Sequence, residues 1–348
     1  MRAIATGLSD VGLQREHNED SFVVLSEAAG AGTGGTGAGY DLFIVADGMG
    51  GHRAGDVASR LATDTIAEFF KTTASEDVTW PFHFDTSLSE EENRLLTGIR
   101  IANRQIFERS AKSRECRGMG TTVVGALFSP KKNRMYIGHV GDSRCYRVRR
   151  GELRLMTRDH SLINDYLMAM PDLTEEQKSE LPKNVITRAL GMQDQVMVDL
   201  QADEPQAGDV YLLCSDGLSG MIADDEILDI LMSTRDIDEG CRRLVARANE
   251  HGGEDNITAV LVRIDESPSS QQLATQPAPD VADDTTARAM PPVTASTITD
   301  VPPAPPAAPA PPAAAPTPPL IESEPTLPTG TVPASQPSGR PPDSGKRR

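Results

Sequence analysis

Short apolar runs, separated by stretches rich in glycine and charged residues, recur along the chain as far as about residue 264. The runs are rich in β-branched and aromatic residues, which suit the half-buried surface of a pleated sheet. They predict strands at Phe22–Ser26, Asp41–Ala46, Thr121–Phe128, Met135–Val140, Arg144–Val148, Val196–Leu200, Val210–Cys214 and Ile257–Ile264. Gly151-Glu152, followed by the run Leu153–Met156, predicts a hairpin turn after the strand at Arg144.

Longer stretches between these runs repeat apolar residues with the period of one buried helix face. They predict helices over about Ala54–Lys71, Asp224–Met232 and Ile237–Glu250. Another helix is expected to open at Ser89, because Glu92 three residues later completes a capping box. Strands mostly follow strands, with helices inserted in pairs, so the pattern favours an α+β fold in which helices are layered against sheets.

Two segments fit neither state. Ala28–Gly39 is almost entirely glycine, alanine and threonine and is expected to be a flexible connection. It contains a G-x-G-x-x-G match, but the match leads into a strand and not a helix, which argues against a dinucleotide site. Ser161–Lys183 contains several charged residues and two prolines, and we expect a surface flap that could cover a site.

The composition changes near Ile264. Of the 26 prolines, 21 lie from Asp265 onward, and that segment has no Phe, Tyr or Trp. Such a composition cannot bury enough apolar surface to offset the entropy of ordering it. We therefore expect a folded domain over residues 1–264 and a disordered tail over residues 265–348.

The net charge of −17 is an acidic balance that repels phosphate backbones and anionic lipids, so nucleic-acid and membrane-surface roles are disfavoured. The four cysteines are widely spaced without a Cys-x-x-Cys pair, which predicts reduced thiols and neither disulfides nor zinc. No apolar run long enough to span a membrane and no export signal occur. The expectation is a monomeric protein of the cytoplasm.

Aspartates from distant parts of the chain lie where strand-like runs end or begin: Asp20, Asp47, Asp216 and Asp255. Glycine follows Asp47 and Asp216, and it lets the backbone approach a bound ion closely. One isolated Asp-Gly is more often a turn than a ligand. A set of carboxylates at strand ends is nevertheless what hard, oxygen-seeking cations require, so the sequence predicts a metal-dependent enzyme.

At these residues the chain resembles a known family, the PP2C-type (PPM) metal-dependent protein phosphatases in their bacterial form. The resemblance extends from about Ala5 to Ile264 and rests on ordered motifs at Gly12–Asp20, Asp47–His52, Gly118–Thr122, Val140–Arg144, Thr157–Ser161, Ile186–Gly191, Ser215–Leu218 and Asp255–Thr258. It implies a central antiparallel β-sandwich flanked by helices on both sides, with a two-metal site at one end.

The resemblance also implies roles for the aspartates. Asp47 would bridge both ions, and the carbonyl of Gly48 would join one of them. Asp216 and Asp255 would complete the coordination of the other ion. Many bacterial members hold a third, weaker ion through the residue that matches Asp142. Octahedral oxygen sites suit Mn²⁺ or Mg²⁺.

Three further residues are implied to act on substrate and water. Arg15 would bind the substrate phosphate, for which a guanidinium offers a permanently charged, bidentate fork. Glu19 and Asp20 would hold metal-bound waters. Two divalent ions roughly 3.5–4 Å apart lower the pKa of a shared water, so that hydroxide can attack phosphorus in line.

One departure concerns the general acid. Eukaryotic members have a histidine at the position of Met49, and a thioether cannot donate a proton. Protonation of the leaving group must then come from metal-bound water or from another residue. For His52 and His160 a structural role is favoured over a role as ligand or acid.

The expected function is hydrolysis of phosphoserine and phosphothreonine on proteins, opposing serine/threonine kinases. The expected partners are such kinases and their phosphorylated substrates. Two alternatives stay open: a catalytically silent module that binds phosphoproteins or a kinase, and a phosphomonoesterase for small molecules with the same chemistry. Manganese binding would argue against the silent module. Comparing the turnover of a phosphopeptide with that of a sugar phosphate would test the small-molecule phosphomonoesterase.

Overall fold

A computed structural model describes residues 1–26, 39–50, 54–73, 80–170, 172–174, 177, 181–182 and 185–267. These residues all belong to one compact unit, Met1–Ala278. Several predictions lie outside the described residues: almost all of the connection Ala28–Gly39, the role of His52, part of the flap Ser161–Lys183, and the tail from residue 268.

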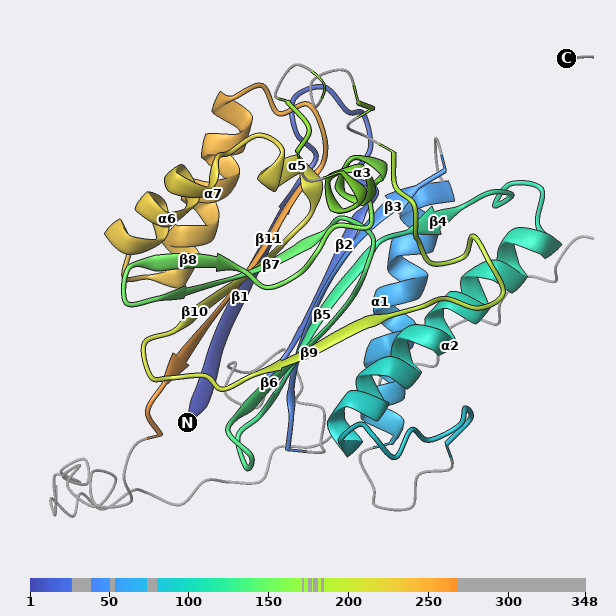
Figure 1. Ribbon diagram of the computed structural model, residues 1–348, viewed down its shortest axis with the longest axis horizontal. Helices are drawn as coiled ribbons and strands as arrows, with labels where there is room; N and C mark the ends of the chain where they lie inside the picture. The colour runs from blue at the N-terminus through green and yellow to red at the C-terminus, as the bar shows by residue number, and fades with distance from the viewer. Residues whose placement is uncertain are drawn as a thin grey trace, which may run out of the picture. The chain divides into compact units, whose positions relative to one another are not determined.

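The strands form two antiparallel sheets (Figure 1). The first sheet has the strand order β1 (Arg2–Asp10), β11 (Ile257–Asp265), β10 (Val210–Cys214), β7 (Arg144–Arg149) and β8 (Glu152–Leu155). The second has the order β2 (Asp20–Leu25), β3 (Asp41–Met49), β5 (Val123–Ser129), β6 (Arg134–Val140) and β9 (Asp199–Asp203), and the short β4 (Gly120–Thr121) pairs with the end of β3.

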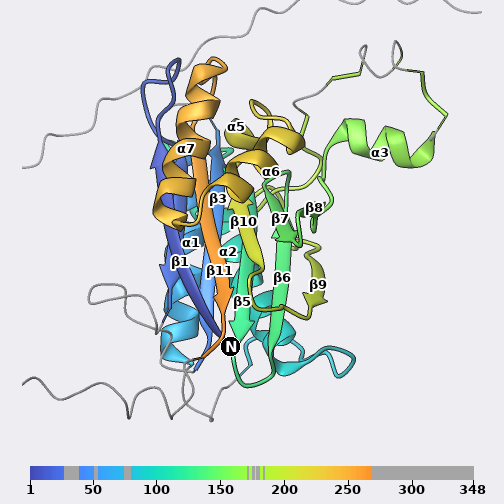
Figure 2. The same ribbon diagram turned by 90° about the vertical axis from the view of Figure 1, so that its left-hand side faces the viewer.

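Helices cover both outer faces of the sandwich, as the two views in Figures 1 and 2 show. One pair packs on the second sheet: α1 (Ala54–Thr72) and α2 (Glu90–Lys112). The first sheet is covered by α5 (Asp216–Ser219), α6 (Asp224–Ser233) and α7 (Ile237–Glu250). A further helix, α3 (Leu162–Ala169), buries no residue. The four layers confirm the predicted α+β sandwich.

β3 shows why this sequence needs layers on both sides. Phe43 and Val45 point into the core between the two sheets, whereas Leu42, Ile44 and Ala46 point toward α1 and α2. Successive side chains of a strand alternate between faces, so a continuous apolar run requires cover on each face. The packing places β3 in the centre of the molecule and its polar end, Asp47, at the rim.

The predicted helix starts are confirmed where a cap is present. Ser89 accepts a hydrogen bond from the backbone N–H of Glu92, and the Glu92 carboxylate accepts one from the Ser89 N–H. This reciprocal pair satisfies two donors that a helix start otherwise leaves free. One face of α2 is fully buried: Leu95, Ile99, Ala102 and Ile106.

Some boundaries were wrong. The strand predicted at Val196–Leu200 is β9 at Asp199–Asp203, because Val196 and Val198 pack against the α1–α2 core before strand pairing begins. The flap prediction overlooked α3, which Ser161 caps by accepting a hydrogen bond from Asn164. The tail was predicted from Asp265, but that residue still belongs to β11 and pairs with β1.

β1 was not predicted at all. Its sequence contains small residues of weak strand preference, and Gly7 is required because a Cβ there would lie 2.5 Å from the ring of Phe22. The partner of β1 is β11, at the far end of the folded sequence. All four cysteines are buried free thiols, as predicted. None of the helices in the described ranges is long and apolar enough to cross a membrane.

Candidate metal centre

The predicted aspartates meet at one end of the sandwich. Asp20 begins β2 and lies opposite Asp47 in the β2–β3 pairing. Asp216 opens α5 directly after β10, and Asp255 precedes β11, the neighbour of β10. Because antiparallel strands bring alternate ends to the same edge, residues separated by 195 and by 238 positions become neighbours here.

Two hydroxyls fix the carboxylate of Asp20. Ser215 and Thr258 donate hydrogen bonds to its Oδ2 at 2.7 and 2.6 Å. Its Oδ1 is buried and has no hydrogen-bond partner. Burial raises the pKa of Asp20 to about 7, although the two hydroxyl hydrogen bonds favour its ionised form.

Asp47 and Asp216 lie within hydrogen-bonding reach of each other. Burial raises the pKa of both carboxyls, and repulsion from Asp20 and from Asp216 raises the pKa of Asp47 further. Oδ1 of Asp216 is buried without a partner. Buried like charges at this separation resist simultaneous ionisation unless a positive charge joins them.

Gly48 is held where no side chain fits. A Cβ at this position would lie 2.2 Å from the carbonyl oxygen of Gly55 and 2.6 Å from that of Glu19. The Gly48 N–H donates to the Glu19 carbonyl at 3.1 Å. The backbone beside Asp47 is therefore packed against two other segments of the site, and the glycine is required by close approach and not by turn geometry.

Asp255 links the site to the predicted phosphate-binding arginine. Its Oδ2 accepts a hydrogen bond from Nη2 of Arg15 at 2.7 Å, and its Oδ1 accepts one from the Asn256 N–H at 2.9 Å. About half of the Arg15 side chain is exposed, so its guanidinium borders both the carboxylates and solvent. The placement leaves Arg15 at the mouth of the site.

Asn256 organises the loop that carries Arg15. Its Oδ1 accepts from the Glu19 N–H at 2.7 Å, and its Nδ2 donates to the carbonyls of Val11 and His17 at 2.9 Å each. The side-chain amide thereby replaces the strand pairing that this loop lacks. The carboxylate of Glu19 lies against Gly55, where a Cβ would be 2.4 Å from Oε2. Burial raises the pKa of Glu19, opposed by Arg15.

Asp142 lies close enough to Asp47 and Asp216 for electrostatic repulsion between the carboxylates. Burial, followed by repulsion from Asp216, raises its pKa to about 7, and its Oδ1 is buried without a partner. Gly141 precedes it with φ +106°, a conformation that favours glycine. Asp142 is therefore placed near the other aspartates, and its role as a ligand of a third ion stays a prediction.

His160 holds that loop in place. Its backbone N–H donates to the Gly141 carbonyl at 2.9 Å, and its Nδ1 accepts from the Gly141 N–H at 3.0 Å. Its Nε2 lies 3.3 Å from the Asp199 carboxylate. Burial lowers the pKa of His160 to about 4, so the ring is neutral and can accept at Nδ1. These contacts support the structural role expected for this histidine.

His160 also belongs to a cluster of three side chains of the kinds that bind metal ions. Ligand atoms of His139, His160 and Asp199 lie within 4.8 Å of one another. The two rings are stacked, with centroids 4.7 Å apart and planes 10° apart. Because the nitrogen lone pairs lie in the ring planes, stacked rings cannot both direct them at one ion. Nε2 of His139 is also engaged, 2.8 Å from the Arg158 carbonyl.

The carboxylates of the aspartates lie farther apart than the ligands of a single ion would. Within the described ranges, no three carboxylates have ligand atoms all within 4.8 Å of one another. Two adjacent ions need such a spread, since ligands then surround a pair of centres roughly 3.5–4 Å apart. Buried oxygens without partners on Asp20, Asp142 and Asp216 supply hard donors for divalent cations. The residues present therefore fit the metal chemistry that the sequence predicts.

Sequence reasoning missed the residues that position the carboxylates. Ser215 and Thr258 fix Asp20, Asn256 fixes the Arg15 loop, and Thr122 holds the backbone of Asp47: its N–H donates to the Asp47 carbonyl at 2.8 Å, and its Oγ1 accepts from the Asp47 N–H at 3.2 Å. Three of these residues stand beside the predicted aspartates in the motifs Ser215–Leu218 and Asp255–Thr258. That adjacency was the available signal, but only the fold shows which carboxylate each one contacts.

A layered β-sandwich with buried carboxylates and an arginine at its rim defines a metal-dependent phosphatase. The family model for protein phosphatase 2C matches residues 29–262. The chain belongs to this family and is a metal-dependent serine/threonine protein phosphatase.

Relatives and solved structures agree with that assignment. The chain is 38% identical over 254 residues to the serine/threonine phosphatase stp of Listeria welshimeri, covering 73% of this chain and 93% of that protein. The S. agalactiae serine/threonine phosphatase structure is similar with a TM-score of 0.64 and 34% identity, covering 76% of this chain and all of that one. The catalytic domain of the phosphatase PstP, solved in complex with two manganese ions, has a TM-score of 0.60 and 33% identity, covering 76% and 99%.

Proposed function

We propose that Asp47, Gly48, Asp216 and Asp255 hold two Mn²⁺ or Mg²⁺ ions, with Asp142 contributing to a third position. The observation that carries this assignment is the cluster of buried carboxylates whose pKa values are raised by burial and mutual repulsion. A divalent cation relieves that repulsion, and oxygen-only donors suit these two metals. A relative of known structure binds two manganese ions.

The chain's own residues divide the remaining work. Arg15 presents its guanidinium to the substrate phosphate, and its contact with Asp255 sets the direction of that fork. Asp20, held by Ser215 and Thr258, and Glu19 accept hydrogen bonds from water at the site and orient it toward phosphorus. When bound, the paired ions lower the pKa of water and neutralise the phosphoryl oxygens. Met49 has no proton to give, so another group protonates the leaving oxygen.

The same proposal covers the domain division and the partners. Residues 1–265 form the catalytic domain, since the described fold closes with β11 at Asp265, and the chain from residue 266 onward is a tail outside it. The substrates are phosphorylated proteins, serine/threonine kinases and the targets of those kinases among them. Relatives named as serine/threonine phosphatases support this substrate class.

The test is hydrolysis of a phosphothreonine peptide across a series of metals. We expect turnover with Mn²⁺ or Mg²⁺ and none after chelation. Asp216→Asn should lose about 100-fold or more of the activity and should bind manganese more weakly by calorimetry. Asp64→Asn, an exposed change on α1, is the matched control. Full activity in Asp216→Asn, or an inactive wild-type protein with manganese, would contradict the assignment.

A further inference from the structure

A hollow surface extends from the end of β3 to α2. Its inner part, about 430 Å³, is lined in part by Met49, Met192 and Met197. Its outer part, about 600 Å³, lies against α2. Gln195 and Val196 line both parts, so the two parts together form one groove.

The inner end of this groove is tied to the metal centre by strand geometry. Met49 follows Asp47 by two positions on β3, so both side chains leave the strand on the same face. Met49 pairs with Gly120 of β4. Met192 packs against Gly120 so closely that a Cβ added to this glycine would lie 3.1 Å from the Met192 sulfur. Leu190 exchanges backbone hydrogen bonds with β4 in both directions. The groove therefore begins beside the carboxylates and on a fixed wall.

The inner groove has an exposed apolar wall beside polar residues such as Arg188 and Gln193. Met192 and Met197 are 54% and 70% exposed, among the largest values for apolar side chains in the described ranges. Ile186 and Val196 extend the apolar surface. Methionine side chains are flexible and polarisable, so they adapt to different apolar partners. Exposed apolar surface next to an active site indicates an interaction site.

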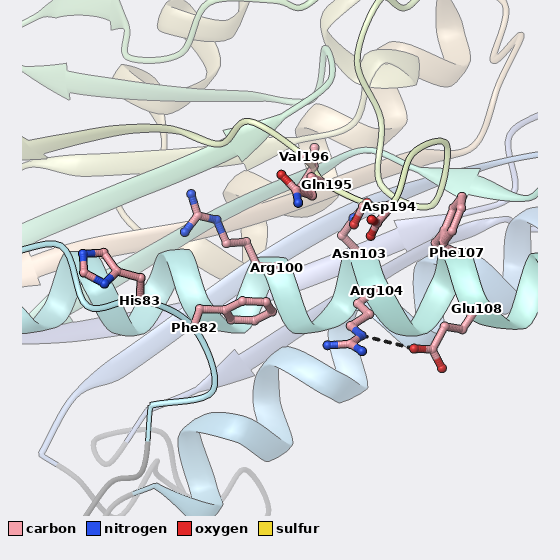
Figure 3. Close-up of a pocket in the computed structure, with 10 residues that line it drawn as sticks. All are labelled: Phe82, His83, Arg100, Asn103, Arg104, Phe107, Glu108, Asp194, Gln195 and Val196. Atoms are coloured by element: carbon pink, nitrogen blue, oxygen red, sulfur yellow. Dashed lines mark hydrogen bonds and ion pairs between the residues drawn. The ribbon is translucent and has the colours of Figure 1, made fainter.

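The outer groove has a rigid floor. Figure 3 shows Arg100 and Asn103 on α2 beside the segment that carries Gln195 and Val196, with Phe82 and His83 at one end. Nδ2 of Asn103 donates to the carbonyls of residues 193 and 194 at 3.0 Å each, and its Oδ1 accepts from the N–H of residue 191. The buried amide thus fixes the distance between α2 and the segment above it.

The charge in the outer groove is uneven. Arg104 is neutralised by Glu108 at 3.1 Å. Arg100 has no acidic partner within 4.0 Å among the residues that the structure describes, although Asp194 lines the same hollow. In a protein with a net charge of −17, a guanidinium without an ion pair is available to an external carboxylate.

We propose that this groove binds the polypeptide that flanks the phosphorylated residue of a protein substrate. An apolar side chain near the phosphoresidue packs on Met192 and Met197, and an acidic side chain farther along the same flank pairs with Arg100. The inference rests on the proposed function, because the groove starts at the site where phosphate would be bound. It defines the substrates as phosphoproteins that have, on one side of the phosphoresidue, an apolar residue close to it and an acidic residue farther along the chain.

The test compares phosphothreonine peptides with p-nitrophenyl phosphate, which is too small to reach the outer groove. One glutamate is moved along either flank of the peptide. We expect a lower KM for glutamate positions on one flank only. Arg100→Glu should raise KM for the best peptide about 10-fold, as loss of a charge-assisted contact does, while p-nitrophenyl phosphate turnover stays within about twofold. Replacing the glutamate of the peptide by lysine should restore binding to Arg100→Glu.

Two further variants sharpen the result. Arg109→Glu makes the same charge change on an exposed part of α2 that lines neither hollow, and it should leave peptide KM unchanged. Met197→Ser should raise KM for peptides with an apolar flank and not for p-nitrophenyl phosphate. Equal peptide KM values for wild type and Arg100→Glu, with both substrates turned over, would overturn the groove inference alone. A wild-type protein inactive on both substrates with manganese would instead overturn the proposed function.

Discussion

Asp20 uses its two carboxylate oxygens differently. Oδ2 is saturated by Ser215 and Thr258, while Oδ1 is buried without a partner. A carboxylate fixed in this way cannot rotate to avoid its acidic neighbours. Its orientation is set by the fold before any ligand arrives, and the free energy of that arrangement comes from packing elsewhere in the molecule.

Charge repulsion between the aspartates should be measurable as stability. Asp47→Asn removes one of several buried like charges, so we expect the melting temperature of the chelator-treated protein to rise by ~2–4 °C for each ~1 kcal/mol of relief. The variant should also lose the manganese-induced gain in stability expected for the wild type, about 2.7 kcal/mol at a manganese concentration 100 times the dissociation constant. Thermal unfolding with and without manganese tests both, with Asp64→Asn as control. A metal-free Asp47→Asn less stable than wild type would contradict this account.

The close packing at Gly48 gives a second prediction. Gly48→Ala places a methyl group 2.2 Å from the Gly55 carbonyl oxygen, and two backbone segments must separate to admit it. We expect a loss of about 1–3 kcal/mol in stability and manganese binding weakened about 10-fold or more. Urea unfolding and calorimetry measure these effects. Gly125→Ala, where the new methyl group meets Leu95 at an ordinary 3.4 Å, is the control and should change neither greatly.

At this scale the sequence indicated which carboxylates cluster better than it indicated the residues that position them. Asp47 and Asp216 are recognisable because each ends an apolar run and precedes glycine. The hydroxyls of Ser215 and Thr258 have no such pattern, since a single hydrogen bond to a residue more than 190 positions away leaves no period in the sequence. Only strand pairing brings them to Asp20.

At the scale of elements, one polar cluster joins the two sheets. Asp203 on β9 accepts hydrogen bonds from Arg147 on β7 at 2.8 Å and from the hydroxyl of Tyr211 on β10 at 2.6 Å. β9 belongs to one sheet, and β7 and β10 belong to the other. Burial opposes ionisation of Asp203, but the Tyr211 and Arg147 contacts prevail and lower its pKa. The carboxylate therefore stabilises the sandwich in its ionised form.

Asp203→Asn should lower the free energy of unfolding by about 1.5–3 kcal/mol at pH 7, because a charged hydrogen-bond acceptor is lost. The pKa of Asp203 is lower in the folded protein than in the unfolded chain. Its contribution is therefore complete above about pH 4, the unfolded value, and is lost as pH falls through the folded value. Urea unfolding of wild type and variant from pH 7 to pH 3 should show the difference shrinking only below about pH 4. A difference that stays constant over this range would refute the assignment.

Element predictions succeeded where apolar period and caps agreed. β3 and α2 have long apolar patterns, and α2 also has its capping box. β1 failed because alanine, glycine and threonine in its sequence give little strand preference, although pairing with β11 imposes the strand. The position of β9 was predicted wrongly because Val196 and Val198 pack against the core without belonging to a strand. Burial alone does not distinguish a strand from a packed loop.

At the scale of the whole molecule, the folded unit should act without its tail. Deletion of residues 268–348 removes only sequence that follows β11, so peptide kcat/KM should stay within about twofold of the full chain. The measurement is manganese-dependent peptide turnover by both forms. A large loss of turnover would show that the tail belongs to the catalytic unit.

The antiparallel pairing of β1 with β11 also determines when the enzyme first exists. These strands come from opposite ends of the folded sequence, and Asp255 and Thr258 arrive with the later one. A ribosome adds roughly 5–20 residues each second, and the nascent chain cannot close its first sheet until nearly the whole domain has emerged. A nascent chain that ends before β11 lacks its last strand and the residues that arrive with it, so activity starts only when synthesis of the domain is complete.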